Sequence, residues 1–217
     1  MLEELTWGLP VILYLFLAGM GAGATTVSAS MLLRGGGGVR GAHHEIARYG
    51  AFLGPIPVIV GTALIVFELG AFQNGDYFKF INLLLVMNLS PMNVGSWLLF
   101  LFTATSIVYA YTYLEMPMPF GDRLKVRRAF AWINIPLGIG VAVYTGVMLG
   151  AMPSRPFWNS PVLALIFLVS ALSTGTALIV LARALFTRGD LSAEQRETMH
   201  KSGLIMASSD TMWIGFE

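Results

Sequence analysis

The sequence has 217 residues, of which 56% are hydrophobic and only 12% are charged. Soluble domains carry about 25% charged residues, so this composition points to a protein whose main solvent is the lipid bilayer. There is no cysteine, which excludes disulfides, thiolate-bound iron–sulfur clusters and cysteine-based zinc sites within this sequence. The net charge is +1 and the basic residues are confined to short loops, so nucleic-acid binding has no support.

Windowed hydropathy predicts an all-α integral membrane protein with five complete transmembrane helices, because a crossing needs about 20 apolar residues. In chain order, the predicted spans are about Leu9–Leu33, Ala51–Phe72, Met92–Tyr113, Ala129–Met152 and Val162–Phe186. A sixth helix begins near Ser202 and reaches Glu217, which gives about 24 Å of helix against a hydrocarbon core of roughly 30 Å. We therefore expect a single transmembrane domain over residues 1–217 that is truncated or only partly represented.

The connections between the spans contain two further elements. Residues 73–88 carry an apolar stripe at helical spacing, which predicts a short helix at the outer membrane interface. A re-entrant or irregular cap over the outer helix ends explains that stripe equally well. Gly35–Gly38 is interpreted as a flexible connector, because no strand precedes it and no phosphate-loop Lys follows. His43 and His44 come next, and we expect both to be solvated.

The Lys and Arg residues are distributed unequally between the two sets of loops. Eleven lie in the loops after the first, third and fifth spans, against only Lys79 and Arg155 on the other side. The positive-inside rule then places the odd-numbered loops in the cytoplasm and the N-terminus outside.

Acidic residues within the spans are few, and each is informative because a charge in hydrocarbon is costly. Glu68 lies near the outer end of the second span, and Asp210 lies in the middle of the sixth segment. Glu68 is interpreted either as a carboxyl that reaches water near the headgroups or as a proton-transfer group. Asp210 has no nearby Lys or Arg in its segment, which favours a proton-transfer role there as well.

The predicted topology brings several polar and aromatic residues to one depth of the membrane. Tyr14, Glu68 and Tyr144 all fall in the outer half, and Trp158 and Asn159 begin the fifth span on the same side. Together they offer hydrogen-bond donors, a proton acceptor and an aromatic wall, which is the set that a quinone requires.

Small residues recur within the spans at a spacing typical of close helix contact. Gly19 and Gly23 are four residues apart in the first span, and so are Gly146 and Gly150 in the fourth. Helix packing is the main interpretation, and cleared space for a flat ring is the alternative.

Haem and metal sites are not expected in this sequence. The histidines, His43, His44 and His200, all lie outside the predicted spans, whereas membrane cytochromes hold haem iron between histidines inside the bundle.

Four short blocks occur in an order and spacing that resemble the NrfD-like family, the integral-membrane subunits of polysulfide-reductase-type oxidoreductases. The blocks are Ser90-Pro91-Met92 with Gly95-Ser96-Trp97, Tyr144-Thr145-Gly146, Pro156-Phe157-Trp158-Asn159-Ser160-Pro161 and Ser170-Ala171-Leu172-Ser173-Thr174-Gly175. The resemblance extends more loosely over most of the chain, and it implies a bundle of eight or more helices in the prokaryotic inner membrane.

The resemblance also implies a function. It implies a quinone (menaquinone or ubiquinone) bound at the outer side, with Tyr144 matching the tyrosine of the family's Tyr-Thr-Gly motif and Glu68 the acid that ends the second span. Tyr14 stands where family members can carry a histidine. The implied partners are a four-cluster iron–sulfur ferredoxin-like subunit outside the membrane and a molybdopterin catalytic subunit. This chain has no visible redox centre of its own, so we expect electrons to come from the partner.

A second hypothesis is a proton- or ion-conducting transporter subunit that uses Glu68 and Asp210 without quinone chemistry. Against it, the sequence shows no evident inverted repeat and no matched pair of broken helices. A third hypothesis combines both, with quinone chemistry coupled to proton movement through Asp210.

Overall fold

The structure is a computed structural model that describes residues 9–35, 42–68, 91–114, 122–150 and 162–186, and every regular element in these ranges is a helix. The helices are α1 (Leu9–Arg34), α2 (Ala42–Leu53), α3 (Pro55–Glu68), α5 (Pro91–Tyr111), α6 (Arg123–Gly150) and α7 (Val162–Phe186). The interfacial helix expected at residues 73–88 and the segment expected from Ser202 lie outside the described residues.

The prediction of five membrane-crossing helices is confirmed. Segments long and apolar enough to cross a bilayer run over Pro10–Arg34, His44–Ile65, Asn93–Tyr111, Arg123–Gly150 and Val162–Leu185. Two predicted starts are wrong, since the second span begins at His44 rather than Ala51 and the fourth at Arg123 rather than Ala129. Both helices begin with a polar first turn that lies outside the apolar core. A hydropathy window scores such a turn as loop.

The second span is made of two helices, α2 and α3, that meet at Gly54. Pro55 lacks a backbone N–H and disfavours helical geometry in the residue before it, so one helix ends and the next begins there. The amide of Gly54 still donates to the carbonyl of Gly50 at 2.9 Å. A Cβ at Gly54 would overlap the hydroxyl of Thr25, so the interruption coincides with a close contact to α1.

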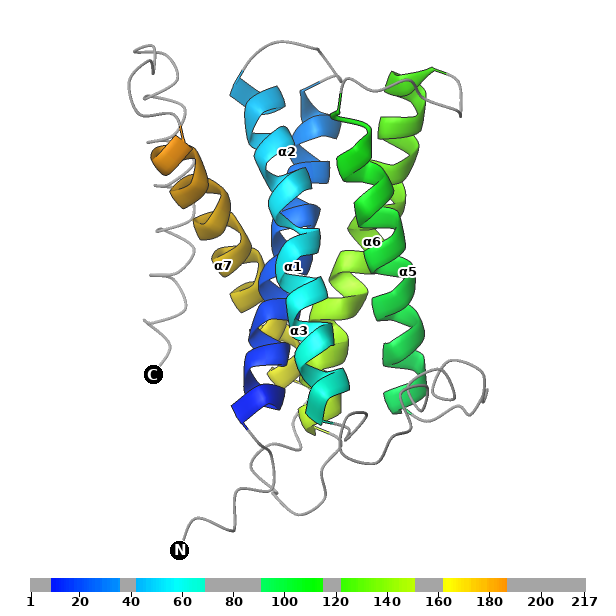
Figure 1. Cartoon of the computed structure of the whole chain (residues 1–217), viewed down its shortest axis with the longest axis vertical. Coiled ribbons are helices and arrows are strands. Elements are labelled where there is room, and N and C mark those ends of the chain that lie inside the picture. The colour runs from blue at the N-terminus through cyan, green and yellow to red at the C-terminus, as the bar shows by residue number, and fades with distance from the viewer. Residues whose placement is uncertain (1–8, 36–41, 69–90, 115–121, 151–161, 187–217) are drawn as a thin grey trace, which may run out of the picture.

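Helix α1 lies at the centre of the bundle and packs against α2, α3, α6 and α7 (Figure 1). Helix α5 packs mainly against α6. The core is divided along α1 into clusters. One lies near the start of α1 and contains Tyr14, Leu15, Ala18, Ala22, Val58, Leu99, Phe102 and Val141. Another lies near its end and contains Ala29, Leu32, Ala47, Ala51, Tyr109, Tyr113 and Ala131.

Glycines make close helix contacts, and one member of each predicted pair, Gly23 and Gly146, is among them. A Cβ at Gly23 would overlap the backbone of Ala171 in α7, and one at Gly175 would overlap the backbone of Gly23. A Cβ at Gly146 would likewise press on the backbone of Ala164, where α6 meets α7. Backbones can approach this closely only where no side chain intervenes, so these glycines set the position of α7.

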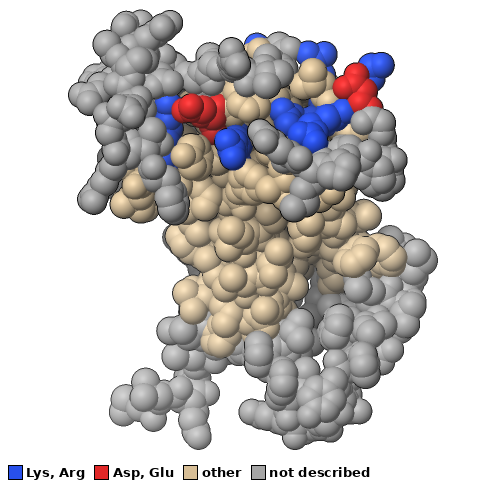
Figure 2. Space-filling view, turned by 45° about the horizontal axis from the view of Figure 1, so that its top comes forward, with Lys and Arg blue, Asp and Glu red and all other residues tan. Residues whose placement is uncertain are grey.

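The described charged side chains gather at one end of the bundle, and the middle is apolar (Figure 2). The basic ones lie at the end of α1, in α2, at the start of α6 and at the end of α7, and they are Arg34, Arg48, Arg123, Lys125, Arg127, Arg128 and Arg183. Large apolar side chains face outward from the middle of the bundle, such as Trp132, which is 66% exposed. An apolar band of this kind suits a surface in contact with lipid tails.

Candidate functional site

The phenol of Tyr144 lies near the end of α6 that is opposite to the charged end of the bundle. Its ring rests against Gly95 of α5, where a Cβ would fall on the ring and on the hydroxyl. The side chain is 9% exposed. Gly95 belongs to one of the four sequence blocks that we singled out, so the structure joins two of those blocks at this contact.

The Tyr144 hydroxyl donates a hydrogen bond to the thioether sulfur of Met148, one helical turn further along α6, with 3.2 Å between Oη and Sδ. A thioether is a weak acceptor, so the phenol proton is held loosely. The next two residues of the Tyr-Thr-Gly block serve the fold. The Thr145 hydroxyl donates to the carbonyl of Ala142 at 2.7 Å, and Gly146 lies against α7.

The second phenol of the site comes from Tyr14, in the first part of α1. This side chain is 4% exposed and belongs to the core cluster at this end, and Val11 and Leu149 are among the partly buried apolar side chains that pack against that cluster. The same cluster includes Val141 of α6, three residues before Tyr144. Gly61 of α3 packs on the backbone of Tyr14. A Cβ added at Gly61 would lie 3.2–3.4 Å from backbone atoms of Tyr14.

Glu68 is the last residue of α3, at the same end of the bundle as the two phenols (Figure 1). It lies seven residues beyond Gly61, the residue that packs on Tyr14, and this corresponds to about 10 Å along the helix. The backbone of Glu68 is therefore nearer the end of the bundle than the phenols are, and its side chain lies outside the described residues.

The structure thus places Tyr14 and Tyr144 at the same end of the bundle, as the predicted topology required. The remaining predicted site residues, Trp158, Asn159 and Asp210, lie outside the described residues. The block from Ser170 to Gly175 has a packing role, since Ala171 and Gly175 form the contact with α1.

A second pair of buried phenols, which sequence reasoning missed, lies at the charged end of the bundle. The Ser28 hydroxyl donates to the carbonyl of Ala47. Tyr109 lies 3.2 Å from Ser28, and Tyr113 lies 3.1 Å from Tyr109, oxygen to oxygen. Because Ser28 has only one proton, Tyr109 donates to Ser28 and Tyr113 donates to Tyr109. Burial raises the pKa of the Tyr113 phenol, so this group keeps the proton that it donates.

Arg127, near the start of α6, lies beside this network and binds the chain just after the end of α5. Its Nη2 donates to the backbone carbonyl of Thr112 at 2.6 Å and its Nε to the hydroxyl of the same residue at 3.3 Å. The guanidinium also lies 4.0 Å from the centroid of the Tyr113 ring. The ring of His44 lies 5.7 Å from the same ring, and the side chain is half-buried, so His44 is only partly solvated.

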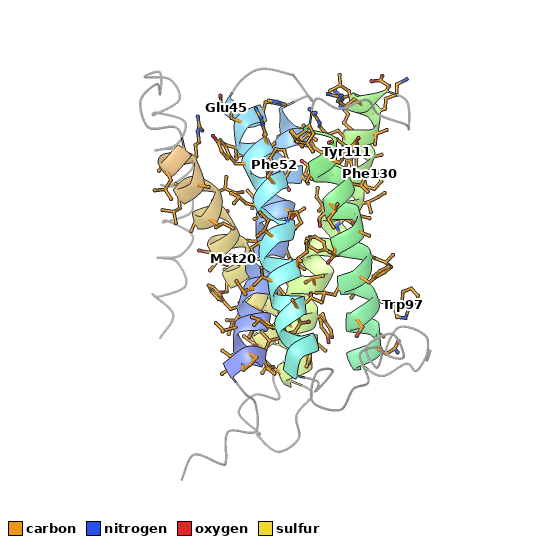
Figure 3. The ribbon with its side chains drawn as sticks, in the orientation of Figure 1. Met20, Glu45, Phe52, Trp97, Tyr111 and Phe130 are labelled. Atoms are coloured by element: carbon orange, nitrogen blue, oxygen red, sulfur yellow. The ribbon has the colours of Figure 1, made fainter. Side chains whose placement is uncertain are left out.

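Arg183 forms a further charged contact at this end. It is 1% exposed, and its Nη2 donates to Oε2 of Glu45 at 3.3 Å, which links the end of α7 to the start of α2. Figure 3 labels Glu45 at this end of the bundle. Its Nε and Nη1 have no hydrogen-bond partner in the part of the chain that the structure describes. Sequence reasoning counted Arg127 and Arg183 as loop residues. The position of Arg183 could have revealed it as a residue of the helix. It lies seven residues after Thr176, inside an apolar run that continues to Phe186.

Within the described ranges, no group of three or more His, Cys, Asp or Glu side chains is arranged to hold a metal ion.

The fold and the site define a class: a multi-pass, all-helical membrane protein with two buried phenols at the end away from its charged side chains. Within that class, the chain belongs to the NrfD family, because the family model described as "Polysulphide reductase, NrfD" matches residues 1–214.

Curated relatives agree with this assignment. The chain is 29% identical over 210 residues to the C chain of polysulfide reductase from Wolinella succinogenes, a match that covers 91% of this chain and 64% of the relative. It is 27% identical over 213 residues to Protein NrfD of Escherichia coli, covering 92% of this chain and 66% of the relative. It is also 27% identical over 214 residues to Protein NrfD homolog of Haemophilus influenzae, covering 91% and 65%. The chain thus spans about two thirds of the length of these relatives. No solved structure matches it.

Proposed function

We propose that this chain is the quinone-binding membrane subunit of a multi-subunit oxidoreductase. It exchanges electrons between the membrane quinone pool and an iron–sulfur partner outside the cytoplasm. The observation that carries the proposal is the pair of buried phenols contributed by Tyr14 and Tyr144 at one end of the bundle.

The residues present fit a quinone. Quinone carbonyls need hydrogen-bond donors in an otherwise apolar site, and the hydroxyl of Tyr144 is bonded to no stronger acceptor than the Met148 sulfur among the described residues. The side chains around Tyr14 are apolar, which suits a ring and a hydrocarbon tail.

When bound, a quinone would supply the chemistry of taking up or releasing two electrons and two protons. Tyr144 and Tyr14 would donate to its carbonyls and orient it. Glu68, at the end of α3, would exchange protons with the site. Trp158 and Asn159 complete the proposed binding set, and Asp210 is proposed as a further proton-transfer group.

The remaining features of the proposal follow from the family and from the charge distribution. One relative is named as a single lettered chain of a reductase, which favours a complex of several subunits. The proposed partners are a four-cluster iron–sulfur ferredoxin-like subunit and a molybdopterin catalytic subunit. The proposed location is the prokaryotic inner membrane with the N-terminus outside, and residues 1–217 are proposed to form one domain. The quinone is menaquinone or ubiquinone.

The experiment that tests the proposal is Tyr144→Phe in the complex purified through this chain, with quinone affinity and quinol-linked turnover both measured. A neutral hydrogen bond contributes about 0.5–1.5 kcal/mol, so affinity should fall about two- to twelvefold. Tyr113→Phe is the matched control, because it removes another buried phenol from the opposite end and should leave quinone affinity unchanged. Equal affinity in the wild type and in Tyr144→Phe would overturn the assignment of Tyr144.

A further inference from the structure

Two residues outside the proposed donor set determine where the Tyr144 hydroxyl lies. Gly95 lies directly against the ring, and a Cβ at this position would overlap both the ring and the hydroxyl. Met148 accepts the hydroxyl proton through its sulfur at 3.2 Å. The first contact is with α5 and the second is within α6, so the phenol is fixed from two helices.

We propose that Gly95 and Met148 are positioning residues for quinone recognition by Tyr144. Gly95 admits the phenol ring into the contact between α5 and α6. Met148 holds the phenol proton in a weak bond that a ligand carbonyl can take over. This inference rests on the proposed function, in which Tyr144 donates to a quinone carbonyl.

The weakness of the Met148 sulfur as an acceptor makes it favourable for the Tyr144 hydroxyl to bond to a quinone carbonyl instead. Elsewhere in the spans, several buried hydroxyls are bonded to backbone carbonyls, as Thr25 is to Gly21 at 3.0 Å and Thr26 is to Ala22 at 2.8 Å. A phenol bonded in that way would exchange one carbonyl for another on binding a quinone, with little gain. Because a thioether is a weaker acceptor than a carbonyl, the phenol of Tyr144 gains on the exchange.

Gly95→Ala tests the steric part of the inference. The added methyl group should displace the ring and with it the hydroxyl, and quinone affinity should fall by up to the factor expected for Tyr144→Phe, about two- to twelvefold. In a Tyr144→Phe background the same change should have almost no further effect, because the hydroxyl through which it acts is already gone. Gly140→Ala is the matched control, since a Cβ at Gly140 would contact only the side chain of Leu98.

Met148→Leu tests the acceptor part, and its expected effect has the opposite sign. Leucine keeps the volume of methionine and removes the sulfur, so the free protein no longer offers the phenol a competing partner. Quinone should then bind about twofold more tightly, which corresponds to the loss of one weak hydrogen bond. Met31→Leu is the control for a methionine packed in this bundle. Met31 lies near the end of α1, at the charged end of the bundle, and its replacement should leave quinone affinity unchanged.

A readout that needs no quinone separates this inference from the proposed function. With 3-fluorotyrosine at position 144, the ¹⁹F resonance of the quinone-free protein should shift in Gly95→Ala and in Met148→Leu, but not in Gly140→Ala. If the resonance shifts while no variant, Tyr144→Phe included, changes quinone affinity, the proposed function fails and the packing arrangement stands. If Tyr144→Phe weakens binding while Gly95→Ala and Met148→Leu change neither resonance nor affinity, the positioning inference is overturned.

Discussion

Among the described residues, the bundle holds two buried phenols at each end, and their surroundings differ. At the charged end, Tyr113, Tyr109 and Ser28 form a chain of donors that finishes on the carbonyl of Ala47, and each member has a protein partner. At the opposite end, the hydroxyl of Tyr144 donates to a sulfur, with Tyr14 nearby in an apolar cluster.

This difference separates a structural role from a binding role for the same side chain. A buried polar group with satisfied hydrogen bonds stabilises one arrangement of the helices, and removing one member leaves another unpaired at a cost of about 1–3 kcal/mol. A buried donor that is held weakly contributes little to the fold and remains available to a ligand. Burial of a tyrosine therefore identifies a site only when its hydrogen-bond partners are also known.

The largest expected effect concerns which membrane side each end faces, and it is all or none. The chain has no cysteine, so single cysteines can be introduced directly. Lys125→Cys, at an 86% exposed side chain of the charged end, should react with an impermeant maleimide only from the cytoplasm. Asn74→Cys should react only from outside. The reverse pattern would move the proposed quinone site to the cytoplasmic side and contradict an external iron–sulfur partner.

The next largest effect is expected from Glu68→Gln, which keeps size and hydrogen bonding but removes the titratable proton. If Glu68 exchanges protons at the phenol end, quinone should still bind while turnover falls by about a hundredfold, the lower range of general acid–base catalysis. Asp210→Asn should leave affinity unchanged and lower turnover only if protons reach the site through the membrane interior. Affinity and turnover measured separately decide this, and normal turnover in both variants would show that protons come directly from outside water.

The smallest effect is expected from Arg127→Met, which breaks the network at the charged end. It removes two hydrogen bonds to Thr112 and the contact with the Tyr113 ring. Hydrogen bonds to charged groups contribute about 1.5–3 kcal/mol, so the free energy of unfolding should fall by roughly that amount while quinone affinity stays the same.

Steric trapping of the unfolded state measures this loss. Lys125→Met is the control, since its ion pair with Asp122 is exposed and should matter by less than about 1 kcal/mol. A loss of quinone affinity in Arg127→Met with unchanged stability would break the distinction between the two ends.

Much of the architecture could be predicted from the sequence because hydropathy is a local property of the chain. Each span carries its own apolar run, so five crossings were visible without knowledge of their neighbours, and the fifth was predicted with the bounds that α7 has. The gathering of basic side chains at one end followed from the alternation of loops. The spacing of Gly19 and Gly23 predicted a close helix contact, and Gly23 forms one with α7.

Other features depended on contacts between helices, which no local window contains. The count of loop charges assigned Arg127 and Arg183 to loops, although Arg183 lies within the predicted fifth span, because a charged side chain is taken as exposed unless its partners, here Thr112 and Glu45, are known. The start of the second span was wrong for a related reason, since the polar first turn of α2 packs against Tyr113 through His44.

For the site, the sequence by itself determined that Tyr14 and Tyr144 share one depth of the membrane, because depth follows from position within a span. The tertiary structure alone decided that Tyr144 lies against Gly95 and donates to Met148, and that Tyr109 and Tyr113 are bonded within the protein. The physical reason is that residues at one depth can face any direction around their helices. Only the packing of the helices against one another determines which side chains meet.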